Sequence, residues 1–345
     1  MTVMPSSSRP PPSLAVAQRP LLVCSIDAVF MSALQAGAFD ARVHSVFHRV
    51  INLERAAGEL VTLAARGMDN APLTAIVDIP NFAAAGIAVD DAVAAIDGTL
   101  HVGDSLVLNF AAASVWRARL PSYATAPSRL PEQLAAARRY LAQQGVRGGM
   151  SVQADAECAF ASEVAVALEQ RSAWLLDALL HSRHAEACRH AVSMLGLGPG
   201  LTPSGDDFLV GLFAVLNVTG SPCQGWLDGG AQVLLHAEHA THALSLAALT
   251  EAAAGRVRES IAALIDGLLH GTPTTLVQPL RRVLAIGATS GADMVAGILA
   301  GLELNLQVEA KRSVESSPLL MRASPAAAVS QPISTGASWS CPSKR

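Results

Sequence analysis

The sequence predicts an α+β fold in which a small β-barrel or sandwich-like domain is followed by an all-helical domain. From about residue 20 to 120, short segments alternate apolar and polar residues and are separated by turn residues, as in half-buried strands. From about 130 to 305 the apolar residues recur at helical spacing, and no segment has convincing strand character. We therefore place the domain boundary near Pro121, with a β-rich domain at 20–120 and a helical domain at 121–310.

In the β-rich domain, the alternation is clearest in ARVHSVFHRVINL (residues 41–53). ELVTLAAR (59–66) and LTAIVDI (73–79) are short apolar runs, and two further strands are expected on either side of the Gly103-Asp104 turn. The aliphatic segment Ala84–Ile96 is compatible with either a helix or a loop that crosses the sheet.

The helical domain begins with PEQLAAARRYLAQQG, where Pro131 suits the first turn of a helix and Gly145 suits its end. Seven more helices are expected at 160–182, 183–196, 204–218, 228–254, 257–270, 274–286 and 290–304. Residues 1–19 and 311–345 are rich in Pro, Ser and Ala, which predicts disorder.

The composition raises the question of a membrane protein, because 51% of the residues are hydrophobic and only 15% are charged. Apolar runs such as Phe208–Val218 are nevertheless shorter than the roughly 18–20 residues that span a bilayer, and no signal peptide is apparent. The net charge of −4 without a basic block argues against nucleic acid as the main partner. The five cysteines form no Cys-x-x-Cys pair and predict reduced, mostly buried thiols in a cytoplasmic protein.

The segment GLGPGLTPSGDDFL (196–209) lies between two apolar helices. Gly196 is a usual residue for ending a helix. Thr202 is a candidate N-cap with Pro203 at the first helical position, and Ser204 is an alternative cap. Helix capping therefore accounts for about half of the segment.

Capping leaves the number of glycines, and Gly205 in particular, to be explained. A glycine in a first helical turn costs stability, and it lets a ligand or another backbone approach closely. Free amides and hydroxyls at a helix start bind anions. Asp206 and Asp207 suit the helix dipole, and they also suit a proton, a cationic group or a hard cation such as Mg²⁺.

A second segment, SGADMVAGILAGL (290–302), aligns with SGDDFLVGLFAVL (204–216) at a constant offset of 86 residues. Ser, Gly, Asp, the second Gly and the final Leu coincide. We predict that the two helix starts face each other across one site. The alternative is that Ser and Asp only cap helices and that the mid-helix glycines allow close helix crossing.

The predicted site contains three candidate catalytic carboxyls and a larger set of candidate anion-binding groups. The carboxyls are Asp206, Asp207 and Asp293. The anion-binding set is Gly198, Gly200, Thr202, Ser204, Gly205, Thr289, Ser290, Gly291, Thr241 and Ser245. No metal ligands are assigned, because three histidines spaced three apart (His236, His239 and His242) cannot share one helix face, and Mg²⁺ is the only cofactor considered.

These segments resemble a known family. LGLGPGLTPSGDDFLVG (195–211) is similar to the signature of the family that includes the AllH-type subunit of oxamate carbamoyltransferase. THALSLAALTEAAAGRV (241–257) and IGATSGADMVAGILAGL (286–302) resemble later segments of that family, so the resemblance covers roughly 20 to 305. One position differs, because Ala288 stands where we expect histidine.

The resemblance implies a subunit of a three-component assembly with an FdrA-like, acyl-CoA-synthetase-like protein and a second uncharacterised protein. It implies phosphorolysis of oxalurate to oxamate and carbamoyl phosphate in purine and allantoin breakdown. Two alternatives remain: a non-catalytic structural or regulatory partner, and a related enzyme that processes another carboxylate.

Overall fold

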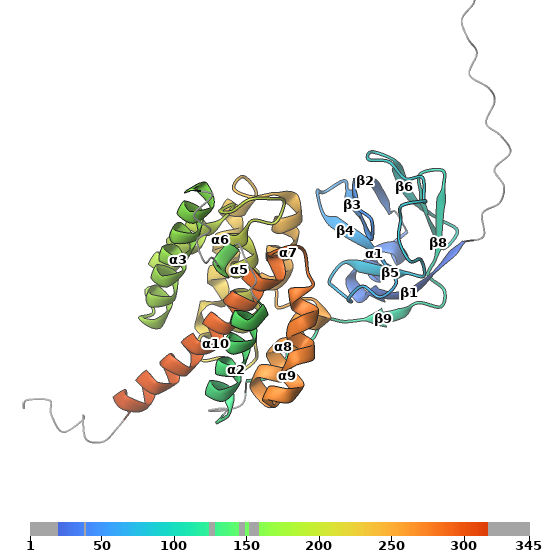
Figure 1. Cartoon of the computed structure of the whole chain (residues 1–345). Coiled ribbons are helices and arrows are strands. Elements are labelled where there is room, and N and C mark those ends of the chain that lie inside the picture. The colour runs from blue at the N-terminus through green and yellow to red at the C-terminus, as the bar shows by residue number, and fades with distance from the viewer. Residues whose placement is uncertain (1–19, 38, 124–127, 145–148, 152–158, 317–345) are drawn as a thin grey trace, which may run out of the picture.

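The computed structural model describes residues 20–37, 39–123, 128–144, 149–151 and 159–316. A β domain and a helical domain lie side by side, and the chain passes from one to the other after strand β9 (Figure 1). The predicted α+β fold is therefore confirmed. Residues 1–19 and 317–345, for which we predict disorder, lie outside the described residues, whereas residues 311–315 belong to the last helix.

The β domain is a closed barrel. Its strands run in the order β5-β4-β3-β2-β6-β7-β8-β1, and an antiparallel pairing of β1 with β5 closes the ring. The short β9 pairs with the second half of β1. The strands are β1 (Leu21–Asp27), β2 (Asp40–Val46), β3 (Val50–Arg55), β4 (Leu60–Ala65), β5 (Thr74–Val77), β6 (Ala92–Ile96), β7 (Thr99–Val102), β8 (Leu106–Asn109) and β9 (Ser114–Trp116).

The barrel interior is filled by side chains, as is usual for eight strands. Val43, Leu53, Leu63 and Leu100 are completely buried in one apolar cluster. The inside of the barrel is therefore a core, and any ligand site lies outside it.

Three local predictions for the β domain need correction. The segment 41–53 forms a hairpin of β2 and β3 rather than one strand. Of the two alternatives for Ala84–Ile96, the loop is correct for its first part, but its last five residues form β6. Helix α1 (Ala28–Gln35) was not predicted. It forms because the Asp27 carboxylate accepts hydrogen bonds from the first amides of the helix, and because Phe30 packs into the barrel core.

The helical domain contains the predicted succession of helices, with one break. The helices are α2 (Leu130–Gln144), α3 (Ala159–Leu180), α4 (His184–Met194), α5 (Ser204–Leu216), α6 (Leu227–Ala237), α7 (Ala243–Ala253), α8 (Glu259–His270), α9 (Pro273–Leu284) and α10 (Ser290–Glu315). The predicted helix 228–254 is divided into α6 and α7 by a turn. The Thr241 hydroxyl in that turn donates to the buried Asp206 carboxylate, a contact between distant segments that local periodicity does not reveal.

Helices α5 and α10 form the centre of the helical domain. All thirteen residues of α5 are buried. A Cβ atom at Gly211 would overlap the carbonyl oxygen of Met294, and a Cβ atom at Gly297 would overlap that of Phe208. Gly211 and Gly297 are 86 residues apart, and so are Phe208 and Met294. The glycine of each repeat segment therefore contacts the equivalent backbone position of the other segment, and the two helices cross there.

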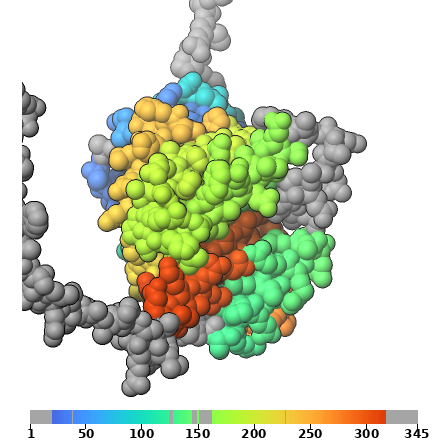
Figure 2. All heavy atoms as spheres, turned by 90° about the vertical axis from the view of Figure 1, so that its left-hand side faces the viewer, coloured from blue at the N-terminus to red at the C-terminus, as the bar shows by residue number. Residues whose placement is uncertain are grey.

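The face of the molecule away from the barrel is formed by α3, α10 and α2 (Figure 2). Among the described residues, no helix combines the length and the apolar character needed to cross a membrane. Cys188 and Cys223 are partly buried and Cys24 is exposed, so the described thiols are more accessible than predicted.

We expect Gly211→Ala to lower the free energy of unfolding by about 1–3 kcal/mol or more, because the new methyl group has to push α5 away from the α10 backbone. Chemical denaturation measures the change. The control is Gly225→Ala, where an added Cβ meets no atom within 4 Å. Equal stability of both variants would mean that α5 and α10 are not in contact at this glycine.

Candidate functional site

The loop that precedes α5 requires its glycines. Gly196, Gly198 and Gly200 have positive φ angles of 69°, 125° and 92°, a backbone conformation that other residues rarely adopt. Helix α5 begins at Ser204 with Pro203 in the N-cap position and no side-chain cap. The predicted capping role of Thr202 is therefore wrong. Its hydroxyl instead lies 2.9 Å from the Ser290 hydroxyl at the start of α10.

The two helix starts lie together, as the repeat predicts. Asp207 of α5 interacts with Ser290 of α10, and Asp293 of α10 interacts with Ser204 of α5. Each of these pairs maps onto the other by the offset of 86 residues. The repeat therefore builds two equivalent carboxyl–hydroxyl pairs.

The first-turn amides do not form the open anion site that we predicted. The Gly205 amide donates to the Leu197 carbonyl, and the Gly291 amide donates to the Ile286 carbonyl, each at 2.9 Å. Both glycines are required because another backbone lies against them. A Cβ atom at Gly205 would overlap the Met194 carbonyl oxygen, and one at Gly291 would overlap that of Val283.

Asp206, a predicted catalytic carboxyl, has both of its oxygens engaged by the protein. Its Oδ1 accepts the Gly196 amide at 2.9 Å, and its Oδ2 accepts the Thr241 hydroxyl. Ser245 is buried and acts on the same carboxyl. Asp206 thus connects the end of α4 with the turn between α6 and α7, and it does not line the cavity described next.

A cavity of about 340 Å³ lies between the barrel and the helical domain. Its walls are mainly apolar and come from both domains: Phe47, Val50, Leu60, Ala71, Leu73, Val210, Leu244, Ala248, Val257, Ile261, Ile286 and Met294 are among them. Of the predicted site residues, Thr202, Asp207 and Ser290 line it. The predicted residues that do not are Asp206, Asp293, Gly198, Gly200, Ser204, Gly205, Thr241, Ser245, Thr289 and Gly291.

The two equivalent carboxyls have different surroundings. Oδ1 of Asp293 accepts the Met150 amide at 2.6 Å, and Gly149 lies so close that a Cβ there would overlap the carboxyl. Asp207 instead lines the cavity. The Oδ2 atoms of both carboxyls are buried and have no hydrogen-bond partner among the described residues. The structure thus covers one carboxyl with main chain and places the other in the wall of the cavity.

Burial controls the protonation of these carboxyls. It raises the pKa of Asp207 to about 7, with a further increase from Asp293 and Asp206 and an opposing effect of the Ser290 and Thr202 hydroxyls. Burial likewise raises the pKa of Asp293 to about 6, against hydrogen bonds from Met150 and Ser204. A carboxyl with a pKa near 7 can both accept and donate a proton at neutral pH.

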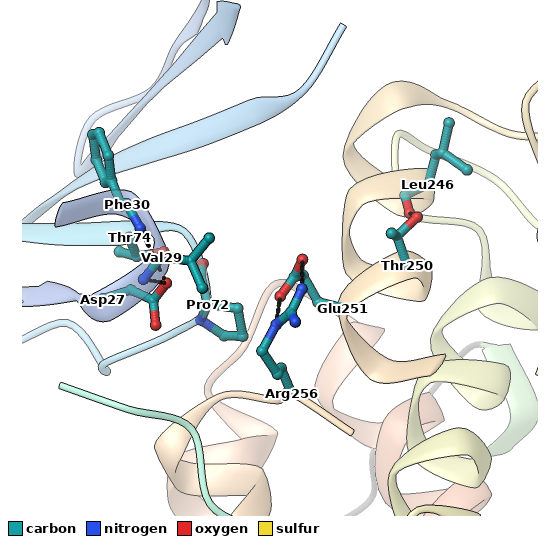
Figure 3. A network of polar contacts seen from close by, with 9 residues as sticks. All are labelled: Asp27, Val29, Phe30, Pro72, Thr74, Leu246, Thr250, Glu251 and Arg256. Carbon is teal, nitrogen blue, oxygen red and sulfur yellow. Dashed lines mark hydrogen bonds and ion pairs between the residues drawn. The ribbon is translucent and has the colours of Figure 1, made fainter. Parts of the chain in front are cut away.

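Two arginines that we did not predict also line the cavity. Arg256 forms a bidentate ion pair with Glu251 of α7, at 2.5 and 2.7 Å, on the side of the cavity that faces Pro72 of the barrel (Figure 3). Arg258 is partly buried, and its guanidinium has no hydrogen bond or ion pair to a described residue. Arg256 lies near the end of the segment 241–257 and Arg258 follows it directly, but only the folded chain turns them into the cavity.

The described residues do not form a metal site on their own. Nowhere among them do three or more His, Cys, Asp or Glu side chains lie close enough together to hold a metal ion. Asp207 and Glu251 are the carboxylates of the cavity, and Glu251 is paired with Arg256. Asp207 is therefore the residue that could share a Mg²⁺ ion with a bound phosphate, since this ion is commonly held by one or two carboxylates and phosphate oxygens.

Comparison with known families agrees with this division of the chain. The model of the family described as oxamate carbamoyltransferase subunit AllH matches residues 194–302. The model described as the AllH family N-terminal domain matches residues 22–115. The first range contains both helix starts, and the second covers nearly the whole barrel. No solved structure matches the chain.

We expect the contribution of Asp207 to the thermal stability to become less favourable as the pH rises from about 4 to 7. The folded state keeps a proton on Asp207 up to a pH of about 7, whereas the unfolded chain releases it near 3.8. Between these pH values the folded state binds one proton more than the unfolded state, so the free energy of unfolding decreases as the pH rises. Asp207→Asn removes this penalty. The variant should therefore have a higher Tm than the unaltered protein at pH 8 and a smaller difference at pH 4–5.

Differential scanning calorimetry at both pH values measures the effect. Asp104→Asn, at an exposed turn residue, is the control and should show no such change. An Asp207→Asn variant that is less stable than the unaltered protein at pH 8 would contradict the assigned protonation.

Proposed function

The chain belongs to the AllH family of oxamate carbamoyltransferase subunits, and we propose that it binds the small anionic substrate of that complex in the cavity between its two domains. The reaction that we propose is phosphorolysis of oxalurate to oxamate and carbamoyl phosphate, in purine and allantoin catabolism. A family of subunits implies partner subunits. We propose an FdrA-like protein and a second uncharacterised chain as these partners, in the cytoplasm.

The observation that carries the proposal is the position of Asp207. Asp207 and Asp293 are both buried with an unpaired Oδ2, but only Asp207 lines the cavity, together with Thr202 and Ser290. A buried polar group that is kept unpaired costs free energy. Such groups are common where a ligand completes the hydrogen bonds, and titratable groups with shifted pKa values are enriched at functional sites.

The chemistry of the reaction gives Asp207 a specific role. A phosphate oxygen attacks the terminal carbamoyl carbon of oxalurate, and the bond between that carbon and the bridging nitrogen breaks. The proton of hydrogen phosphate has to reach the leaving nitrogen of oxamate, which leaves atoms and charge balanced. Asp207, with a pKa of about 7, would accept that proton and deliver it to the nitrogen.

We expect Asp207→Asn to reduce carbamoyl phosphate formation about 10²–10⁴-fold, the usual contribution of a positioned acid–base group. The assay contains oxalurate, phosphate and the three co-expressed chains. Asp293→Asn is the matched control, because Asp293 is the equivalent buried carboxyl of the repeat but lies outside the cavity. It should retain most of the activity.

Size-exclusion chromatography establishes that each variant still assembles. Equal loss of activity in both variants would refute the assignment of Asp207 to the reaction. Activity that requires the chain but survives Asp207→Asn would make it a non-catalytic subunit. The absence of activity with every combination of chains would refute the substrate.

A further inference from the structure

The barrel wall of the cavity carries a row of polar side chains. Ser45 on β2, Asn52 on β3, Thr62 on β4 and Thr74 on β5 are paired in register across four neighbouring strands. The last three of them line the cavity. The other barrel residues that line it are apolar: Phe47, Val50, Leu60, Ala71, Pro72 and Leu73. Among the described residues, the barrel therefore brings polar side chains to the cavity along this row alone.

The row holds the side chain of Asn52 from both sides. The Asn52 amide donates to the Ser45 hydroxyl at 2.9 Å and accepts a hydrogen bond from the Thr62 hydroxyl at 3.0 Å. A side-chain amide has two N–H donors and two carbonyl lone pairs. One N–H and one lone pair of Asn52 thus have no partner among the described residues. The neighbours fix the orientation of this amide and leave half of its hydrogen-bonding capacity to a ligand.

The polar groups of the two cavity walls do not bond to each other. Asn52 and Thr74 are buried, with 5% and 7% exposure, yet the three polar residues of the barrel wall bond only to barrel residues. On the helical wall, Asp207 interacts with Ser290 and Thr202. A cavity of about 340 Å³ lies between these two sets of polar groups. Ligand pockets commonly have this form, with mainly apolar walls and a few placed polar groups.

We propose that Asn52 binds the ligand of this cavity from the barrel side, and that Ser45 and Thr62 position its amide. This inference rests on the proposed function for the reaction in which Asn52 takes part. It gives the barrel, whose interior is filled, a direct role in ligand binding. Asn52 carries no charge, so it contributes hydrogen bonds and orientation, and the proton transfer stays with Asp207.

Steady-state kinetics of the assembled complex with oxalurate and phosphate test the proposal. Asn52→Ala should raise the KM for oxalurate about 2- to 10-fold, the usual effect of losing a neutral hydrogen bond. The kcat should stay nearly unchanged, because the contact is made before and during the reaction alike. Asn52→Asp keeps the shape of the side chain but places a negative charge beside an anionic substrate, so it should raise the KM about 10-fold or more.

Two variants of the barrel serve as matched controls. Ser45→Ala removes the same Asn52–Ser45 hydrogen bond, but Ser45 does not line the cavity. It should lower the Tm and raise the KM less than Asn52→Ala does. Asn109→Asp places the same charge on β8, outside the cavity, and keeps the oxygen that accepts the Ala111 amide. It should leave the KM unchanged.

Isothermal titration of the complex with oxamate, the product of the proposed reaction, gives a readout without turnover. Its affinity should fall in both Asn52 variants and in neither control to the same extent. Unchanged KM and oxamate affinity in the Asn52 variants would overturn the inference, as would equal changes in Ser45→Ala, which indicate a purely structural role.

The same measurements separate the two proposals. If Asp207→Asn abolishes carbamoyl transfer while both Asn52 variants bind and turn over normally, the proposed function stands and this inference fails. If the Asn52 variants weaken oxamate binding but the unaltered complex forms no carbamoyl phosphate, this inference stands and the proposed reaction fails. A complex that neither binds oxamate nor forms carbamoyl phosphate would refute both.

Discussion

The structure depends on the reciprocal contact between the glycines of α5 and α10. Because Gly211 and Gly297 lack side chains, each helix lies directly on the backbone of the other. This close crossing brings the two helix starts together, with the Thr202 and Ser290 hydroxyls 2.9 Å apart. The same crossing buries Asp207 and Asp293 at the centre of the helical domain, where their protonation is set by burial.

A symmetric pair of helices becomes an asymmetric site through what is packed around it. Main chain at Gly149 and Met150 closes the side of Asp293, whereas the barrel stands at a distance from Asp207 and leaves a cavity. The position of the barrel is fixed by its 66–72 loop, since Asp69 caps the start of α8 and also pairs with Arg282. The barrel therefore serves as a wall of the ligand cavity, while its own interior is a filled core.

Local patterns in the sequence were sufficient for the division into a β domain and a helical domain, for most of the helices and for the pairing of the two repeat segments, because residue periodicity and Gly-Pro turns act over short distances. They missed α1 and β6, and they did not separate β2 from β3 or α6 from α7. Contacts between distant residues were not accessible. Closure of the barrel needs the pairing of β1 with β5, and the turn after α6 needs Thr241 to bond Asp206. For the same reason the sequence could not show that the Gly205 amide is engaged or that Arg258 enters the cavity.

The central claim is that Asp207 is the member of the symmetric pair that meets a ligand. A crystal structure of the assembled complex with oxamate bound tests it most directly. The account predicts oxamate in the cavity between the barrel and α5, within hydrogen-bond distance of Asp207. Oxamate bound at another subunit, or beside Asp293 with the cavity empty, would contradict it.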